Sequence, residues 1–242
     1  MLYNGNIDLK KYEKVLQLTD TFTREGRINK IIGMTVEATG LTCSIGDICK
    51  IFLPGETGVV LSEVVGISES TAFLMPYQEV DGIGYGCKVI NTGKKLTVLA
   101  SDQLIGRAVD ALGNPIDNKG EITAGTSISI GGAPENPMAR PPINEVIELG
   151  VRCIDGLLTI GKGQRMGIFA GSGVGKSTLM GMIARNVKAD VNVIALVGER
   201  GREVVEFIER DLGPEGQKRS VLVVATSDQP ALMRFKCAQT AT

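Results

Sequence analysis

Residues Gly163–Leu179 read Gly-Gln-Arg-Met-Gly-Ile-Phe-Ala-Gly-Ser-Gly-Val-Gly-Lys-Ser-Thr-Leu. The apolar run Met166–Ala170 predicts a buried strand, and a helix is expected to begin near Lys176. The glycines between them let the backbone turn sharply, so that its N–H groups can approach a polyphosphate closely. The positive end of the helix, worth about half a charge, points at the same anion. This order of strand, glycine-rich loop, Lys-Ser and helix predicts a loop that binds a nucleoside triphosphate.

The loop supplies the candidate ligand-binding residues. Lys176 is expected to reach the β- and γ-phosphates, and the Ser177 hydroxyl is expected to ligate Mg²⁺. The usual pattern opens on Gly, whereas this chain has Ala170, which is still small enough to end the strand. Ser177 is thus the predicted metal ligand. The predicted cofactor-binding residues are Gly171, Ser172, Gly173, Val174, Gly175, Lys176, Ser177 and Thr178.

Composition limits the class of protein. The chain has 242 residues, of which 43% are hydrophobic, enough for one or two domains with real cores. A net charge of −1 gives no broad basic field for nucleic acid or anionic membranes. No apolar run is long enough to span a bilayer, and the N-terminus lacks the apolar core of a signal peptide. The five cysteines lack metal-ligand spacing, which predicts reduced, mostly buried thiols of a cytoplasmic protein.

The first third of the chain divides into a helix and a region of strands. Residues 7–18 predict an amphipathic helix, which either packs on its own domain or docks a partner. From about residue 22 to 91, short strands separated by turn signals predict a small closed barrel or a sandwich. The expected strands cover residues 32–38, 48–53, 59–67, 72–75 and 88–90.

The rest of the chain alternates between strands and helices after a proline-rich connection at residues 131–142. A strand ending at Ala170 precedes a helix over 176–187, and a strand over 191–197 precedes a helix over 203–212. Gly213-Pro214 is expected to stop that helix. A third strand over 221–225 leads to a helix from Pro230, with Asp228 as its N-cap. This order predicts an α/β domain with a parallel sheet.

Glu199 is the candidate catalytic base. The chain has no His, so proton transfer falls to carboxylates, lysines or water. Ligands of open parallel sheets lie beyond the carboxyl ends of strands, so Glu199 is expected beside the phosphate loop. There it could polarise the attacking water, an effect typically worth roughly 10²–10⁴ in rate. Arg200 would hold this Glu or stabilise the transferred phosphoryl group. The predicted catalytic residues are Lys176, Glu199 and Arg200, although Gly-Glu-Arg alone equally predicts a charged turn that opens a helix.

Four segments together resemble the ATPases of type III protein export, which are relatives of the catalytic subunits of rotary ATP synthases. They are Gly106–Asp117, Ile154–Gly175, Gly198–Val204 and Ser220–Met233. The segment Ala225–Arg234 resembles the export group specifically. With the barrel region and the N-terminal helix, the chain is most similar to the flagellar export ATPases.

The resemblance implies three parts: an N-terminal helix over 1–19, a β-barrel over 20–92, and the first part of a phosphate-loop domain over 93–242. It implies that Lys176 and Ser177 contact the phosphates and Mg²⁺ of a bound ATP, and that Glu199 is the catalytic carboxylate. Non-catalytic subunits of the rotary relatives carry Gln at this position, so a Glu implies hydrolysis. The implied activity is hydrolysis of Mg-ATP to release chaperones and unfold proteins for export.

The resemblance also implies partners. They are further copies in a homo-hexamer, a central stalk protein, export chaperones, the export gate, and a regulatory stator protein at the N-terminal helix. Nucleic acid is not expected, and the implied location is cytoplasmic, peripheral to the inner membrane at the export gate. Family members continue beyond Thr242 through a Mg²⁺-binding Asp and an arginine finger. The chain is therefore expected to be truncated, with an incomplete nucleotide domain that can be inactive alone.

Other readings remain open at this point. The chain can be a virulence-type secretion ATPase, since both groups carry nearly these motifs. It can be a catalytic subunit of a rotary synthase, although the segment Ala225–Arg234 and the lack of a long insertion before the loop disfavour this. It can also be a nucleotide-binding module without turnover or, more remotely, an RNA-translocating hexamer.

Overall fold

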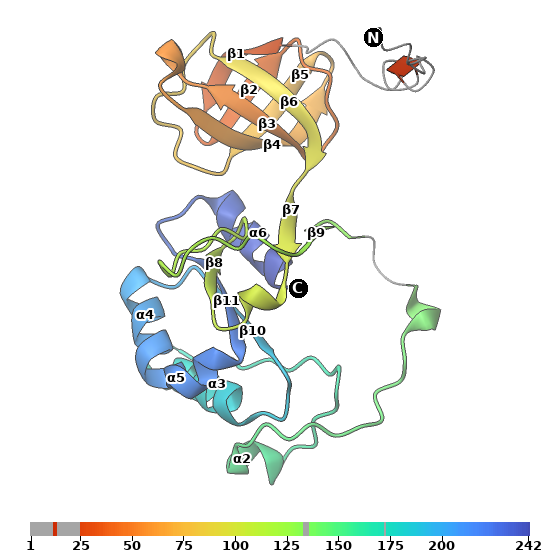
Figure 1. Ribbon diagram of the computed structural model, residues 1–242, viewed down its shortest axis with the longest axis vertical. Coiled ribbons are helices and arrows are strands. Elements are labelled where there is room, and N and C mark those ends of the chain that lie inside the picture. The colour runs from red at the N-terminus through yellow and green to blue at the C-terminus, as the bar shows by residue number, and fades with distance from the viewer. Residues whose placement is uncertain (1–11, 14–24, 133–135, 172) are drawn as a thin grey trace, which may run out of the picture. The chain divides into compact units, whose positions relative to one another are not determined.

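The computed structural model describes residues 12–13, 25–132, 136–171 and 173–242 (Figure 1). The chain separates into two compact units, residues 1–94 and 95–242. Of the helix predicted over residues 7–18, only Tyr12 and Glu13 fall within the described residues, and both are helical.

Strands of the first unit close into a barrel, so the barrel alternative is confirmed over the sandwich. Their order around the barrel is β1-β2-β5-β4-β3-β6, with β6 returning to pair with β1. A short 3₁₀ turn, η1 (Pro54–Glu56), joins β3 to β4. The strands are β1 (Glu25–Ile32), β2 (Thr35–Thr39), β3 (Asp47–Phe52), β4 (Val59–Ser68), β5 (Thr71–Pro76) and β6 (Lys88–Lys95).

Alternate side chains of these strands fill the barrel, as the period of two requires. Ile28, Val36, Ile51 and Leu74 are all buried in one apolar cluster. Such a core excludes water from the barrel interior, and the closed ring of strands leaves no free edge.

The single strand predicted over residues 32–38 is wrong, because the structure makes a hairpin there. Ile32 pairs with Thr35, and Gly33 turns the chain between them with φ 58°. Ile32 and Met34 are therefore exposed rather than buried. Partners across the hairpin point to the same face, so Ile32 lies on the face of Thr35 and Val36 on the opposite, buried face. The apolar alternation in the sequence continues through the turn, so the pattern alone did not reveal the reversal.

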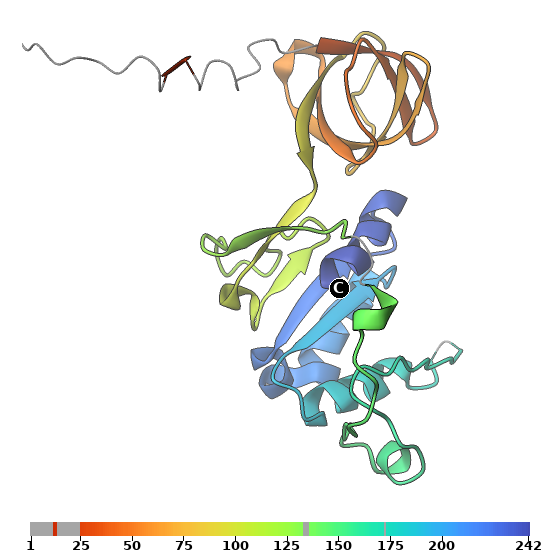
Figure 2. The ribbon, with the colours of Figure 1, turned by 90° about the vertical axis from the view of Figure 1, so that its right-hand side faces the viewer.

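A parallel sheet organises the second unit, with strand order β10-β11-β8. Its strands are β8 (Ala108–Asp110), β10 (Asn192–Val197) and β11 (Ser220–Ala225). One face packs on α3 (Lys176–Asn186), α4 (Gly201–Glu206) and the π-helical segment η4 (Phe207–Leu212). On the other face lies α6 (Ala231–Ala241), where the Cys237 thiol donates to the Val223 carbonyl (Figure 2).

Shorter elements complete this unit. An antiparallel pair, β7 (Thr97–Ala100) and β9 (Thr126–Ser129), precedes the proline-rich connection. The other elements are η2 (Asp102–Leu104), η3 (Pro137–Ala139), α2 (Arg152–Asp155) and α5 (Gly213–Lys218).

The strand predicted over Met166–Ala170 is wrong. These residues form no strand, and Phe169 is 97% exposed. A strand is stabilised by hydrogen bonds to a neighbouring strand, and none in the described chain pairs with this segment. The sheet instead includes β8, whose brevity between turn signals hid it from the sequence pattern.

Two predicted helix boundaries also differ. Gly213 does interrupt the helix, with φ 67° and ψ 173°, but α5 begins at that residue instead of a loop. Asp228 is not the N-cap of α6, which follows Pro230 without a side-chain cap. The side chain of Thr226 hydrogen-bonds Asp228 and lowers the pKa of its carboxyl, so the residue stabilises the preceding turn.

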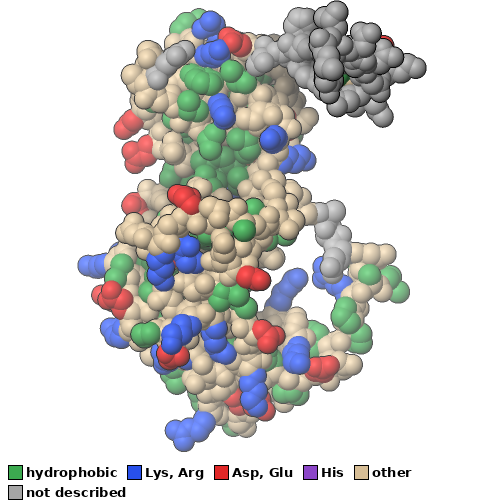
Figure 3. Space-filling model, in the orientation of Figure 1, with side chains coloured by type: hydrophobic (Ala, Val, Ile, Leu, Met, Phe, Trp, Pro, Cys, Tyr) green, Lys and Arg blue, Asp and Glu red, His purple; other side chains and the backbone are tan. Residues whose placement is uncertain are grey.

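Charged side chains of both signs are interspersed over the face drawn in Figure 3. Within the described residues, no helix is long and apolar enough to cross a membrane. All five cysteines are free thiols, and Cys49, Cys87 and Cys237 are buried. The prediction that the thiols are mostly buried is thus confirmed.

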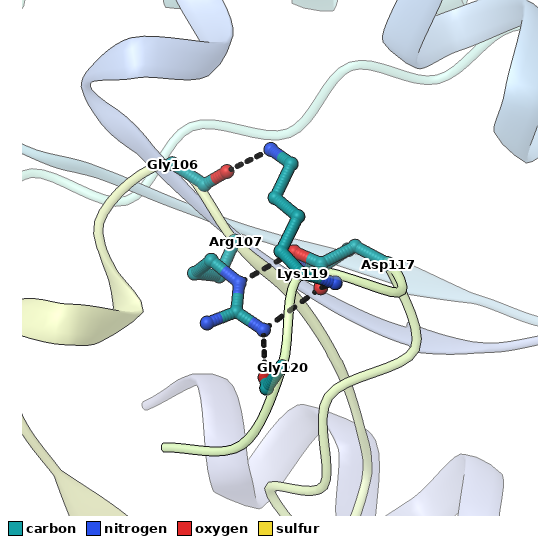
Figure 4. A network of polar contacts seen from close by, with 6 residues as sticks. Gly106, Arg107, Asp117, Lys119 and Gly120 are labelled. Carbon is teal, nitrogen blue, oxygen red and sulfur yellow. Dashed lines mark hydrogen bonds and ion pairs between the residues drawn. The ribbon is translucent and has the colours of Figure 1, made fainter. Parts of the chain in front are cut away.

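A charged network ties the turn after β8 back to that strand (Figure 4). Arg107 donates from Nε and Nη2 to the two carboxylate oxygens of Asp117, at 2.7 and 2.9 Å. Lys119 donates from Nζ to the Gly106 carbonyl at 3.1 Å. The bond from Arg107 is the main reason that the pKa of Asp117 is lowered to about 2. A bidentate pair of this kind fixes the direction of the loop as well as its position.

We predict that Asp117→Asn lowers the free energy of unfolding at pH 7 by about 1–2 kcal/mol, because it removes a charge-assisted bond. The lowered pKa of Asp117 means that its contribution is complete above pH ~4 and disappears as the pH falls toward ~2. Urea unfolding followed by circular dichroism at several pH values measures this. Glu145→Gln, which breaks the exposed pair with Lys162, is the control and should change little. If the free energy of unfolding of Asp117→Asn depended on pH as that of the parent chain does, Asp117 would not be the group that titrates.

Candidate nucleotide-binding site

Two glycines of the glycine-rich loop have positive φ angles, a backbone conformation that residues with a Cβ rarely adopt. Gly173 has φ 75°, and Gly175, at the N-cap of α3, has φ 95°. Val174 between them is 68% exposed. Gly171 is exposed with open space around its α-carbon, and Ser172 lies outside the described residues. No side chain caps α3, so the N–H groups of its first turn remain available to an anion.

The structure brings Lys176 and Glu199 together. Lys176 begins α3, Glu199 follows the end of β10, and Nζ lies 3.4 Å from Oε1. Both side chains remain partly open to solvent, at 47% and 33% exposure. They border a cavity of about 230 Å³ with Ser177, Glu203 and Phe207. A lysine, a serine hydroxyl and a carboxylate thus converge beside the glycine loop.

Arg200 forms an ion pair with Glu203, a residue that was not among the predicted site residues. Its Nη1 lies 3.1 Å from Oε1 of Glu203, so it pairs with Glu203 and not with Glu199. A hydrogen bond with Glu199, followed by the bond from Arg200, lowers the pKa of Glu203. Glu199 and Glu203 are four residues apart where a helix begins, and that spacing was the available sequence signal.

Thr178 directs its hydroxyl away from the loop. Its Oγ1 lies 3.3 Å from Oδ1 of Asp211, a residue of η4 that is only 5% exposed. Of the groups that Thr178 could offer to a phosphate, the backbone N–H is the one left in the first turn of α3.

The donor set fits a Mg²⁺ ion held mainly by phosphate oxygens. Among the described residues, no group of three or more carboxylate or thiol side chains is arranged to bind a metal. Ser177, Glu199 and Glu203 line the cavity beside the loop. In phosphate sites Mg²⁺ keeps several waters and uses few protein ligands, so this sparse set suffices.

A parallel α/β unit with a phosphate loop, preceded in the chain by a closed β-barrel, defines a phosphate-loop nucleotide-binding protein. The family model of the ATP synthase alpha/beta family, beta-barrel domain, matches residues 28–93. The model of the nucleotide-binding domain of the same family matches residues 150–242. The chain belongs to the ATP synthase alpha/beta family.

Relatives place the chain more finely within this family. It is 56% identical over 228 residues to a flagellum-specific ATP synthase of Bacillus subtilis, covering 94% of this chain and 52% of the relative. It is 45% identical to a type 3 secretion system ATPase of Xanthomonas euvesicatoria, covering 90% of this chain and 50% of the relative. The chain spans about half the length of the curated relatives it matches.

A solved structure shares the fold. It is the assembled ATPase EscN in complex with its central stalk EscO, from the type III secretion system of enteropathogenic E. coli. The TM-score is 0.79 at 43% identity, covering 89% of this chain and 52% of that one. These findings confirm the resemblance to the type III export ATPases.

We predict that Gly175→Ala weakens ATP binding, because an alanine at φ 95° costs about 1–2 kcal/mol, or roughly 5- to 30-fold in affinity. Isothermal titration of the 242-residue chain with Mg-ATP measures the effect. Gly131→Ala is the matched control, since that glycine is exposed, has room for a Cβ and has no positive φ. Equal affinities in both variants would show that the loop does not hold the phosphates.

Proposed function

We propose that this chain binds Mg-ATP and that its protein hydrolyses it as the ATPase of a flagellar type III export apparatus. The observation that carries the proposal is the approach of Lys176 to Glu199 at 3.4 Å, where the phosphate loop meets the end of β10. A cation for the phosphates and a carboxylate for the attacking water are the two groups that hydrolysis of a terminal phosphate needs most.

Each residue has a role in the proposed reaction. Lys176 neutralises the β- and γ-phosphate oxygens, together with the N–H groups of the loop. Glu199 orients the attacking water and accepts its proton. Arg200 and Glu203 form an ion pair beside it. Ser177 would hold Mg²⁺, which supplies positive charge against the oxygens of the transferred phosphoryl group.

Sequence identity supports the flagellar system over the virulence-type one. The chain is 56% identical to the flagellum-specific relative and 45% identical to the type 3 secretion relative over nearly the same span. The virulence-type secretion ATPase remains the nearest alternative. A rotary synthase subunit is less favoured, because Ala225–Arg234 resembles the export group.

The proposal includes partners and a location. EscN is assembled in its solved structure and is in complex with its stalk EscO, which supports a ring of copies around a stalk here. We propose a homo-hexamer on this basis, with export chaperones and an export gate as further partners. The N-terminal segment, for which the sequence predicts a helix, would bind a stator protein, and the complex would lie on the cytoplasmic side of the inner membrane.

A second candidate function is nucleotide binding without turnover. The ion pair between Lys176 and Glu199 favours it, because the carboxylate oxygen that contacts the ammonium is less available to orient a water. In this case the chain would act as a nucleotide-dependent interaction module.

We predict that Glu199→Gln retains ATP binding and lowers turnover by roughly 10²–10⁴, because the amide keeps the shape but cannot accept a proton. Steady-state Mg-ATPase activity of the chain, over a range of protein concentrations, is compared with direct ATP binding. Lys176→Ala is the companion variant and should weaken binding itself.

The outcomes separate the two candidate functions. Turnover that rises more than linearly with protein concentration and disappears in Glu199→Gln supports an assembling ATPase. Tight ATP binding with no turnover at any concentration supports the binding module. Full turnover in Glu199→Gln would refute the role of Glu199.

A further inference from the structure

The hydroxyl of Thr178 and the carboxylate of Asp211 form a contact that the proposed reaction does not use. Thr178 lies in the first turn of α3, directly after Lys176 and Ser177, and donates to Asp211 at 3.3 Å. Asp211 is 5% exposed, and it also forms an ion pair with Arg210, whose Nε lies at 3.5 Å and whose side chain is mostly exposed. A buried carboxylate needs such donors, because burying it without them is costly.

The backbone around Asp211 is itself held against α3. Arg185 donates from Nη1 to the Asp211 carbonyl. A Cβ at Gly181 would collide with the same backbone, so only glycine permits this closeness. The π-helical turn of η4 presents both the carbonyl and the side chain of Asp211 to α3. Asp211 is therefore fixed in place on the side of α3 that faces η4.

Asp211 lies in a continuous helical segment, α4 followed by η4, that begins directly after Glu199 and Arg200. Glu199 and Arg200 immediately precede α4, Glu203 lies in its first turn, and η4 follows without a gap. The bond between Thr178 and Asp211 thus joins the turn that carries Lys176 to the run that begins beside Glu199.

We propose that Asp211 is a positioning residue. Through Thr178 it holds the first turn of α3, so that the side chains of Lys176 and Ser177 stay at the cavity beside Glu199. This inference rests on the proposed function as a nucleotide site. Asp211 touches neither nucleotide nor water in this role. The hydroxyl of Thr178 serves as the link and does not contact the nucleotide directly.

The test uses ATP titration of the 242-residue chain and of five variants. Thr178→Val and Asp211→Ala should each weaken ATP affinity by roughly 3- to 30-fold, a usual range for residues that act through another. The double variant should lose no more than the stronger single one, because both changes break the same link. Thr178→Ser keeps the hydroxyl and should retain the original affinity.

Thr240→Val is the matched control. It removes one threonine hydroxyl from the same unit, where Oγ1 donates to the Ala111 carbonyl at 2.6 Å. It should leave ATP affinity unchanged. A loss of affinity in Thr240→Val equal to that of Thr178→Val would mean that affinity follows global stability, which would overturn the proposal. Asp211→Ala can reduce the yield of folded protein. Thr178→Val is nearly isosteric, so its ATP affinity tests the link even in that case.

Other outcomes would also overturn the inference. Weaker binding in Thr178→Val but not in Asp211→Ala would mean that the hydroxyl contacts the nucleotide itself. Additive losses in the double variant would mean that the two residues act independently.

Hydrogen exchange without nucleotide separates this inference from the proposed function. The amide of Leu179, which donates to the Gly175 carbonyl and so closes the first turn of α3, should exchange faster in Thr178→Val than in the parent chain, with no such change in Thr240→Val. Exchange that is unchanged in this turn overturns the inference, whatever the chain binds. Failure of the parent chain to bind ATP would refute the proposed function, and the exchange result alone would then decide the role of Asp211.

Discussion

At Gly181 the backbone of α3 comes so close to that of η4 that any side chain would strike the carbonyl of Asp211. This approach fixes the distance between the phosphate-loop helix and the run that follows β10. A phosphate loop needs its lysine and its carboxylate partner on opposite sides of one anion, so an error of about 1 Å between the two helices would be costly. The position of Lys176 near Glu199 depends on this packing as much as on the loop.

The sequence predicted those elements whose stabilising contacts are local. The helix from Lys176, the strand near 192–197 and four of the five predicted barrel strands follow from period and turn signals, and the structure has them. The fifth, predicted over residues 32–38, is a hairpin instead. The prediction was wrong where an element depends on pairing with residues far away in the sequence. Met166–Ala170 has the composition of a buried strand, but a strand also requires a paired neighbour, and β8 takes part in the sheet instead. Its pairing with β11 depends on residues far along the chain, which no window of sequence reports.

Some features of the candidate site could likewise be predicted from local sequence, and others could not. The glycine loop and the meeting of Lys176 with Glu199 could be expected, because motif order and strand polarity determine them. The partner of Arg200 could not be chosen from sequence, since Glu199 and Glu203 are both within reach of its side chain. The direction of Thr178 was hidden for a further reason. It depends on a π-helical turn that brings Asp211 inward, and no local pattern in residues 203–212 signalled that turn.

The order of strand pairing has a consequence for synthesis on the ribosome. Every barrel strand is complete by Lys95, so the barrel can close as soon as this part of the chain has emerged. The strand β8 must instead wait for β11, roughly a hundred residues later, before it gains its neighbour in the sheet. During that interval β8 lacks the strand that pairs with it, so its apolar side chains have no neighbour in the sheet. The time spent translating this interval is therefore the period in which the chain most needs protection from misfolding.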